Sequence, residues 1–403
     1  MTTSTPSFAA RTTEPGAPLT EATNLVRGGL ERSAFDETAE ALYLTSGYVY
    51  ASAGEAEAAF AGEHDRYIYS RYCNPTVSVF EERLRLLEGA ESCMATASGM
   101  AAVFASLVSL VDAGDRVVGS RALFGSCHVI LAEILPRLGV DTELIDGTSL
   151  AEWERALDRG AKAIFLETPS NPGLEIIDLS AVAELAHAAG AVVIVDNVFA
   201  SPVLQKPLEL GADVVVYSAT KHIDGQGRTL GGAVLGSSAY IDDTLMPFLR
   251  HTGPSLSPFN AWVLTKGLET LRLRVEASSR AAEELARRLE VDHRVETVRY
   301  PNLESHPQYE LAQAQMAAGG TIFTVDLGTK QDAFGFVDRL SLFDISNNVG
   351  DSKSLVTHPA TTTHRRLPPE ARRAVGIGDG MVRLSIGLEG VEDLYRDLDC
   401  SLG

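Results

Sequence analysis

Two residues that could carry out chemistry each stand at the end of an apolar segment. Asp196 closes the run 191–196, and Lys221 closely follows the next such run, 214–218. A lysine amine can form a Schiff base with a carbonyl cofactor, and a carboxylate can keep a pyridine nitrogen protonated so that the ring accepts electrons. Alone, the aspartate could equally cap a helix and the lysine could be a solvated loop residue. Together they predict a site for a carbonyl cofactor with a pyridine ring.

Groups that can bind a phosphate lie close to this lysine in the sequence or at a predicted helix start. Ser218 and Thr220 supply hydroxyls within the segment SATKH. Upstream, the segment 98–100 (SGM) precedes a helical run over residues 101–110. The unpaired N–H groups and the positive dipole end of a helix N-terminus favour anions. The segment 98–100 alone is a weak signal, but it fits the same cofactor if that cofactor carries a phosphate.

Short strand-like and helix-like segments alternate between residues 75 and 235. The strand-like runs are 116–119, 163–167, 191–196 and 214–218. Runs that are apolar throughout are typical of strands buried on both faces of a parallel sheet. One of the helical stretches between them covers residues 179–189 and is followed by Gly190, a typical C-cap residue. The alternation predicts an α/β doubly wound fold, in which ligands bind beyond the carboxyl ends of the strands.

The chain of 403 residues is long enough for a large and a small domain. Residues 1 to about 22 are rich in Thr, Ser, Pro and Ala, which predicts a mobile arm. We expect an N-terminal extension over 1–60 that contacts a neighbouring subunit, a large cofactor-binding domain over 61–255, and a smaller C-terminal α+β domain over 256–403. The last boundary rests on a breaker-rich stretch, a long helical run and two later strands, at 253–258, 260–290, 320–326 and 381–386.

The composition limits the partners and the compartment. The net charge is −20, which argues against nucleic acid or an anionic membrane as a partner because both need basic protein surfaces. No apolar run approaches the roughly 18 residues of a membrane span. The four cysteines are scattered without a C-x-x-C pair, so no metal site or disulfide framework is indicated. The N-terminus also lacks the order of a signal peptide, and we therefore expect a cytoplasmic protein.

Several motifs in a fixed order carry a family resemblance. They are 69–76 (YSRYCNPT), 98–102 (SGMAA), 167–172 (ETPSNP), 196–197 (DN), 218–222 (SATKH), 358–361 (HPAT) and 383–387 (RLSIG). From about residue 40 to the C-terminus, the chain resembles the Cys/Met-metabolism enzymes that use pyridoxal 5′-phosphate (PLP). The resemblance implies fold type I of the PLP-dependent transferases, the aspartate-aminotransferase-like fold, with a mostly parallel sheet in the large domain.

The resemblance also implies a role for each polar residue of the site. Lys221 would form the Schiff base and act as the catalytic base, and Asp196 would hold the pyridinium nitrogen. Asn171 would bind the phenolic oxygen of the cofactor, and Phe124 would stack on its ring. The phosphate ligands implied within the same subunit are Ser98, Gly99, Met100, Ser218 and Thr220.

Two further phosphate ligands are implied to come from a neighbouring subunit. These are Tyr69 and Arg71, and the charge-assisted contact of the arginine would contribute about 1.5–3 kcal/mol. Sites shared in this way imply a homo-oligomer, in this family a homotetramer built as a dimer of dimers. Phe124 stands where relatives usually carry a tyrosine, so any acid–base role of that phenol would be absent or pass to another group such as Lys221 or Tyr69.

Three residues of the C-terminal part are implied at the substrate. Arg383 would clamp the α-carboxylate, because its planar fork suits bidentate binding. Ser354 would orient Lys221. Lys353 reverses a charge in the segment DSKSL, where cystathionine enzymes typically show E-S-L. We expect Lys353 to favour an anionic succinyl tail, with a solvent-facing loop lysine as the alternative.

The segments FGS at 124–126 and KSL at 353–355 are similar to the homoserine-ester sulfhydrylases, and the chain length is closer to the succinyl-ester enzymes than to the longer acetyl-ester ones. We expect O-succinyl-L-homoserine and sulfide as small-molecule substrates, converted to homocysteine and succinate. The alternatives are a cystathionine γ-synthase, which uses cysteine, an O-acetylhomoserine sulfhydrylase and a γ-lyase. A catalytically idle scaffold would have lost Lys221 or Asp196, and a dinucleotide oxidoreductase would show G-x-G-x-x-G after a strand. Neither condition holds.

Overall fold

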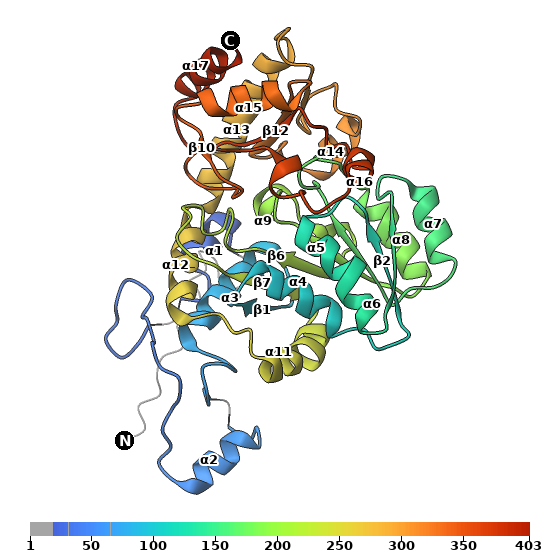
Figure 1. Ribbon diagram of the computed structural model, residues 1–403. Coiled ribbons are helices and arrows are strands. Elements are labelled where there is room, and N and C mark those ends of the chain that lie inside the picture. Colours follow the sequence, from blue (N-terminus) through green and yellow to red (C-terminus); the bar gives the residue numbers. More distant parts are fainter. Residues whose placement is uncertain (1–18, 31, 65) are drawn as a thin grey trace.

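A seven-stranded sheet forms the centre of the larger part of the molecule (Figure 1). The structure is a computed structural model and describes residues 19–30, 32–64 and 66–403. The strands are β1 (Ser92–Thr96), β2 (Arg116–Ser120), β3 (Asp141–Ile145), β4 (Ala163–Glu167), β5 (Val192–Asp196), β6 (Val214–Tyr217) and β7 (Gly232–Gly236). Their order is β1-β7-β6-β5-β4-β2-β3, and β7 alone runs antiparallel to its neighbours. The four strand-like runs of the sequence correspond to β2, β4, β5 and β6, so the mostly parallel sheet is confirmed.

Helices cover both faces of this sheet. Those of the large domain are α3 (Pro75–Glu88), α4 (Gly99–Val108), α5 (Gly125–Val129), α6 (Leu135–Arg137), α7 (Leu150–Leu157), α8 (Leu179–Ala188), α9 (Ser201–Leu204), α10 (Ser238–Tyr240), α11 (Met246–Thr252) and α12 (Pro258–Glu269). Local sequence fixes their ends. Asp178 caps α8 by accepting a hydrogen bond from the backbone N–H of Ala181, and Gly190 follows it with a φ of 73°. The helix predicted over 179–189 is therefore confirmed.

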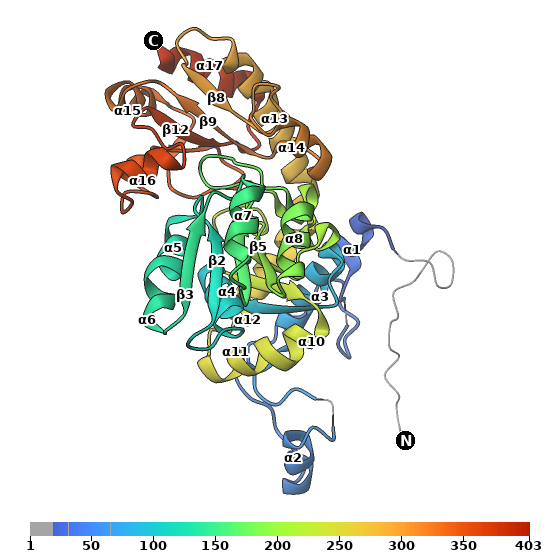
Figure 2. The same ribbon diagram turned by 90° about the vertical axis from the view of Figure 1, so that its right-hand side faces the viewer.

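A second, five-stranded sheet forms the core of the C-terminal domain. Its strands are β8 (Thr297–Arg299), β9 (Ile322–Asp326), β10 (Asp344–Ile345), β11 (Leu355–Thr357) and β12 (Met381–Ser385), in the order β10-β11-β12-β9-β8. The helices of this domain are α13 (Leu271–Glu290), α14 (Tyr309–Gln315), α15 (Lys330–Arg339), α16 (Pro369–Ala374) and α17 (Val391–Leu402). In Figure 2 this domain lies at one end of the large sheet, with α13 connecting the two.

The hydrophobic cores divide within α13 rather than near residue 256, where the sequence placed the boundary. Leu264 and Leu268 of α12, and Leu271 at the start of α13, pack into the core of the large domain, whereas the second core begins at Ala282. The breaker-rich stretch 253–258 marks a loop before α12, and the apolar face of α12 packs on α3. The single long helical run expected over 260–290 is two helices that meet at Thr270.

The N-terminal extension is partly packed on its own subunit and partly projecting. Helix α1 (Glu21–Arg27) lies against α3 with Leu25 buried, so only residues 1–18 of the expected mobile arm remain, and these lie outside the described residues. Helix α2 (Ala53–Phe60) projects away from the body (Figures 1 and 2). Phe35 and Val49 of the extension are both 90% exposed. Its contact with a neighbouring subunit stays a prediction.

One buried ion cluster fixes the extension to the body. Glu40 accepts hydrogen bonds from Arg83 of α3 and Lys266 of α12, and both Glu40 and Arg83 are buried. Within the described part of the chain, no helix is long and apolar enough to cross a membrane.

Replacing Glu40 by alanine is expected to destabilise the protein by about 3–5 kcal/mol, because it removes the nearest carboxylate of the buried Arg83 guanidinium and leaves it with Glu269, which is 3.5 Å away and 30% exposed. A fall in the melting temperature, measured by calorimetry on the intact protein, tests this. The control is Glu55→Ala, which removes a pair with Arg66 whose side chains are 35% and 27% exposed, and which should cost about 0–1 kcal/mol. Equal falls for the two variants would show that the buried cluster contributes nothing special.

Candidate active site

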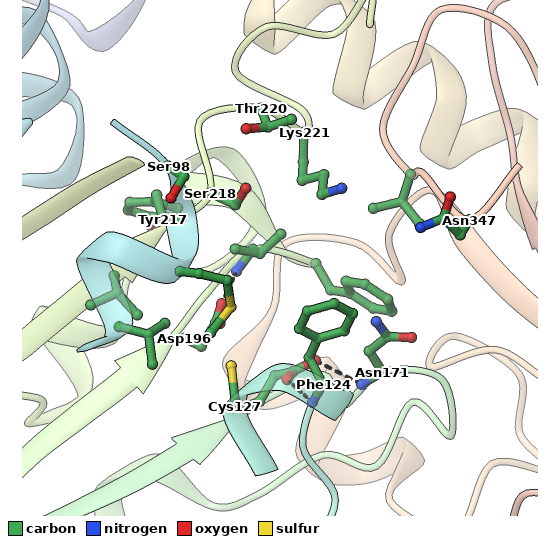
Figure 3. A pocket seen from close by; sticks show the side chains of 18 of the residues that line it. Ser98, Phe124, Cys127, Asn171, Asp196, Tyr217, Ser218, Thr220, Lys221 and Asn347 are labelled. Atoms are coloured by element: carbon green, nitrogen blue, oxygen red, sulfur yellow. Dashed lines mark hydrogen bonds between the residues drawn. The ribbon is translucent and has the colours of Figure 1, made fainter. Parts of the chain in front are cut away.

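A cavity of about 240 Å³ lies beyond the carboxyl ends of β4, β5 and β6, where the two domains meet (Figure 3). Most of the residues predicted for the cofactor line it. They are Ser98, Gly99, Met100, Phe124, Asn171, Asp196, Ser218, Thr220 and Lys221, and Arg383 joins them from the small domain. The shared cavity agrees with the rule that ligands bind at this edge of a parallel sheet.

The start of α4 and the segment after β6 form a compact anion-binding corner. Ser98 caps α4 by accepting a hydrogen bond from the backbone N–H of Ala101. A Cβ atom added to Gly99 would lie 2.5 Å from the Cβ of Ser218, so only glycine lets the helix start approach this closely. Two N–H groups at the helix start therefore stand beside the hydroxyls of Ser218 and Thr220, and this set can bind a phosphate.

The amine of Lys221 enters the cavity from one side. It donates a hydrogen bond of 2.6 Å to the side-chain oxygen of Asn348. Burial lowers the pKa of Lys221 to about 8, and the positive charge of Arg383 acts in the same direction. About a tenth of the amine is therefore neutral at pH 7, and more at higher pH, and the neutral amine is the form that can attack a carbonyl or accept a proton.

Two carboxyl groups lie at the bottom of the cavity. Asp196 ends β5, and Glu167 ends the neighbouring β4 directly opposite in the register. Burial raises the pKa of Asp196 to about 7, even though the backbone N–H of Val198 donates a hydrogen bond to it. Burial also raises the pKa of Glu167, and the negative charge of Asp196 adds to the effect. A cationic ring nitrogen placed beside Asp196 would favour its ionised form.

Arg383 of the small domain and Asn171 of the large domain are joined by a hydrogen bond. The guanidinium donates a 2.9 Å hydrogen bond to the side-chain oxygen of Asn171 and further ones to the backbone oxygens of Asn347 and Asn348. This leaves the amide nitrogen of Asn171 to donate to an oxygen in the cavity. The Nε of Arg383 is buried without a partner among the described residues, so the guanidinium has a free donor for a carboxylate.

Phe124 lies across the cavity from Lys221 (Figure 3). Its ring is partly buried, and its backbone N–H donates a 2.8 Å hydrogen bond to the carboxylate of Glu167. The aromatic face can stack on a ligand ring, but it offers no phenol. Any proton transfer in the cavity therefore falls to groups other than Phe124.

Two of the predicted substrate residues lie elsewhere. Ser354 is buried with its hydroxyl donating to Glu389, so it does not orient Lys221, and Asn348 occupies that place instead. Lys353 is not among the lining residues. Its side chain is 57% exposed and pairs with Asp351, because the turn before β11 directs it outward. The prediction that these two residues act at the substrate is wrong in this respect.

Tyr69 and Arg71 do not line the cavity of their own chain. Tyr69 is 40% exposed, and Arg71 packs over the rings of Tyr69 and Tyr72 while its guanidinium binds the backbone oxygen of Arg250. Their placement is compatible with a role in a neighbouring subunit, which stays a prediction.

Three residues of the site were given no role from the sequence. Asn347 and Asn348 follow the two-residue strand β10, and Glu167 ends β4. The rule that ligands bind beyond strand ends could have identified Glu167, since it stands in β4 where Asp196 stands in β5. Strand β10 is too short for any periodicity to reveal. Among the described residues, no group of three or more His, Cys, Asp or Glu side chains is placed to hold a metal ion.

The side chains around the cavity fit PLP. A phosphate fits the corner between α4 and the Ser218–Thr220 segment, a pyridinium nitrogen fits Asp196, a phenolic oxygen fits the amide of Asn171, and an aldehyde fits the amine of Lys221. The fold and the cavity thus define a PLP-dependent enzyme of the fold-type-I class.

Comparison with known proteins specifies the family. Residues 22–403 match the family model of the Cys/Met metabolism PLP-dependent enzymes, and the chain belongs to this family. It is 61% identical over 389 residues to the O-succinylhomoserine sulfhydrylase of Mycobacterium tuberculosis H37Rv, covering 95% of this chain and 96% of the relative. The corresponding enzyme of Pseudomonas aeruginosa is 48% identical, with 93% of each chain covered.

A solved structure supports the fold and the cofactor. A Campylobacter jejuni protein named as an O-acetylhomoserine (thiol)-lyase, with pyridoxyl-lysine monophosphate in its chain, matches this structure with a TM-score of 0.91 at 32% identity. The match covers 95% of this chain and 100% of the other. The fold type and the PLP cofactor predicted from the sequence are therefore confirmed.

Attachment of PLP to the cofactor-free protein is expected to become faster as the pH rises and to level off above about pH 8. The reason is that the pKa of Lys221 is lowered to about 8 and only the neutral amine attacks the aldehyde. Stopped-flow absorbance between about pH 6 and 10 measures the rate, with the Lys221→Ala protein as the control for non-specific attachment. A rate that keeps rising through pH 10, as for an ordinary lysine with a pKa of about 10.4, would contradict the lowered pKa.

Proposed function

We propose that this enzyme converts O-succinyl-L-homoserine and sulfide to L-homocysteine and succinate. The observation that carries the proposal is the 61% identity, over nearly the whole chain, to a relative with this activity in its name. In the reaction, the bond between Cγ and the succinyl oxygen breaks and a bond between Cγ and sulfur forms. Succinate leaves with the electron pair of the broken bond, so no external oxidant or reductant is needed.

Each polar residue of the cavity has its own role in the proposed reaction. When bound, PLP withdraws electrons from the α-carbon of the amino acid. Arg383 binds the α-carboxylate through its free donors and so fixes the α-carbon near Lys221. The amine of Lys221 takes the proton from Cα and later gives it up again. Its lowered pKa suits both steps. Asp196 holds the ring nitrogen protonated at the far end of the cavity.

Sulfide fits the cavity better than cysteine does as the second substrate. Cysteine would bring a second α-carboxylate. Among the described residues that line the cavity, Lys221 and Arg383 are the only cations, and both are assigned to the first substrate and the cofactor. Sulfide is small and needs no carboxylate clamp. This supports a sulfhydrylase over a cystathionine γ-synthase.

A second hollow of about 520 Å³ adjoins the cavity and gives room for the acyl part of the ester. Phe124 and Asn347 border both spaces. Hydroxyl groups line the outer hollow, from Ser346, Thr357, Thr362 and Thr363. We assign the succinyl tail to this hollow, where the hydroxyl of Ser346 can donate a hydrogen bond to its carboxylate, whereas those of Thr357, Thr362 and Thr363 are already hydrogen-bonded within the chain. This places the tail away from Lys353, whose ammonium pairs with Asp351.

The proposal predicts the order of substrates. With sulfide, kcat/KM should be about ten- to a hundredfold higher for the succinyl than for the acetyl ester of homoserine, because the acetyl ester lacks the carboxylate that the hollow binds. Steady-state rates for the two esters, each with sulfide and with cysteine, test it. Lys353→Met should leave the ratio between the esters unchanged. Faster turnover with cysteine than with sulfide at equal concentrations would instead make the enzyme a cystathionine γ-synthase.

The oligomer and the compartment extend the proposal. Exposed apolar side chains on the projecting extension favour a contact with a second copy, and Tyr69 and Arg71 at its end would then reach the neighbour's phosphate. In that arrangement Tyr69 would also stand at the neighbour's cavity as a candidate for acid–base catalysis. We propose a homotetramer made of two such dimers. All four cysteines are free thiols, which supports a reducing cytoplasm.

Shared sites are tested by mixing two inactive variants. Arg71→Ala is expected to lose most activity through weak cofactor binding, and Lys221→Ala through loss of the amine. In mixed oligomers some sites combine an intact Arg71 with an intact Lys221, so part of the activity should return. The readout is the rate after co-refolding at equal amounts, with each variant refolded alone as the control. No recovery in oligomers shown to be mixed would mean that both residues act within one subunit.

A further inference from the structure

Glu167 holds two loops of the cavity with one side chain. It is 3% exposed, and each carboxylate oxygen has its own partner. One oxygen accepts a 2.8 Å hydrogen bond from the backbone N–H of Phe124, and the other accepts a 2.8 Å hydrogen bond from the backbone N–H of Asn171. Both bonds are drawn as dashed lines in Figure 3, beside the labels of Phe124 and Asn171.

The two residues that Glu167 holds would contact different parts of bound PLP. Phe124 would present its aromatic face to the cofactor ring, and Asn171 would present its amide nitrogen to the phenolic oxygen. They come from different connections of the large domain, the one after β2 and the one after β4. No other described residue accepts a hydrogen bond from these two backbone N–H groups. Because each donor meets a different oxygen of Glu167, a glutamine in the same position would turn its N–H₂ group toward one of them.

A negative charge on the buried Glu167 costs free energy of folding. This argues that Glu167 serves the cofactor site rather than the general stability of the protein. The side chain is buried beside Asp196, and burial together with that like charge raises the pKa of Glu167. No cation of the described residues lies within hydrogen-bonding distance of it, and the positive charge of Arg383 acts only from further away. A buried carboxylate in such surroundings destabilises the protein unless its hydrogen bonds compensate for the free energy of desolvation.

From this geometry we infer that Glu167 is the positioning residue that sets the gap into which the cofactor ring fits, by fixing Phe124 at its face and Asn171 at its edge. Asn171 in turn holds Arg383, so the same carboxylate sets the place of the α-carboxylate clamp. The inference rests on the placement of PLP in this cavity. It does not depend on which ester or nucleophile the enzyme uses.

The test is Glu167→Gln, with Glu81→Gln as the matched control. Glu81 is a partly exposed residue whose carboxyl group has a pKa raised to about 7 by desolvation, but among the described residues it accepts a hydrogen bond from one backbone N–H only, that of Ala95. A glutamine can keep that bond at residue 81, whereas at residue 167 its N–H₂ group must face one of the two N–H donors. A buried donor left unpaired costs about 1–3 kcal/mol, which corresponds to about a ten- to a hundredfold change in an equilibrium constant.

Three quantities are measured for each variant: the dissociation constant of PLP, the circular dichroism of bound PLP in its visible band, and the melting temperature of the cofactor-free protein. For Glu167→Gln we expect PLP to bind about tenfold or more weakly and the visible circular dichroism to fall, because the ring is no longer held in one orientation. Glu81→Gln should change neither. Wild-type affinity and circular dichroism in Glu167→Gln would overturn the inference, whatever the melting temperature, because a purely structural role would affect only the latter.

A measurement on the wild-type protein keeps the inference testable if the variant does not fold. The backbone amides of Phe124 and Asn171 should exchange with deuterium slowly in the cofactor-free protein, as slowly as that of Ala95. Exchange as fast as that of unprotected loop amides would contradict the inference. These readouts are independent of the proposed reaction, since a protein that binds PLP but does not use O-succinylhomoserine would overturn the function and leave the role of Glu167 standing.

Discussion

Burial of charge around one cavity governs the chemistry of this protein. Glu167, Asp196 and Arg383 are buried and Lys221 is partly buried, so desolvation disfavours the charged form of each. The pKa of Asp196 rises to about 7 and that of Lys221 falls to about 8. The two pKa values, which differ by several units in water, therefore lie close together near neutral pH. The amine of Lys221 can therefore accept and release a proton with little free-energy cost near neutral pH, whereas a cationic ring nitrogen beside Asp196 would lower the pKa of that carboxyl group again. The fold must supply the rigidity that keeps such groups buried.

That rigidity comes from the pairing of β4, β5 and β6. Asp196 and Glu167 are register partners, so their separation is set by backbone hydrogen bonds between strands and not by side-chain packing. The helix start at Gly99 is held against Ser218 by the absence of a side chain, which fixes the phosphate corner relative to the same strands. The small domain adds Arg383 from β12, and this side chain is fixed by hydrogen bonds to Asn171 of the large domain. The substrate clamp therefore depends on the relative position of the two domains.

The sequence predicts the parts of this site that follow strong strands, and it fails where the strands are weak. Asp196 and Lys221 follow apolar runs long enough to identify, and the structure places both in the cavity. The substrate loop was misplaced by six residues, at Ser354 instead of Asn348, because the strand before it, β10, consists of two exposed residues with no periodicity. A motif such as DSKSL gives an order of residues but not the direction in which a turn points them.

The boundary expected near residue 256 differs from the point where the two hydrophobic cores divide, for a related reason. Proline and glycine mark loops, and the loop before α12 is one, but a domain ends where its core ends. The pattern of apolar residues in α12 does not say which core they enter. Helix α12 directly precedes α13 in the sequence, yet it packs on α3, which lies far upstream. Only contacts between distant segments decide that, and local propensity contains no information about them.

The physics of burial also applies to the exposed apolar side chains of the N-terminal extension. The buried Glu40 cluster fixes it to the body, whereas Phe35 and Val49, which stand before and after Glu40 in the sequence, are 90% exposed. These apolar side chains stay in contact with water in a single subunit, because no described part of that subunit covers them. Association with a second copy removes that apolar surface from water, and the same step would carry Arg71 to a phosphate. Assembly and completion of the cofactor site would then be one event, so the free energy of cofactor binding and that of subunit association would be linked.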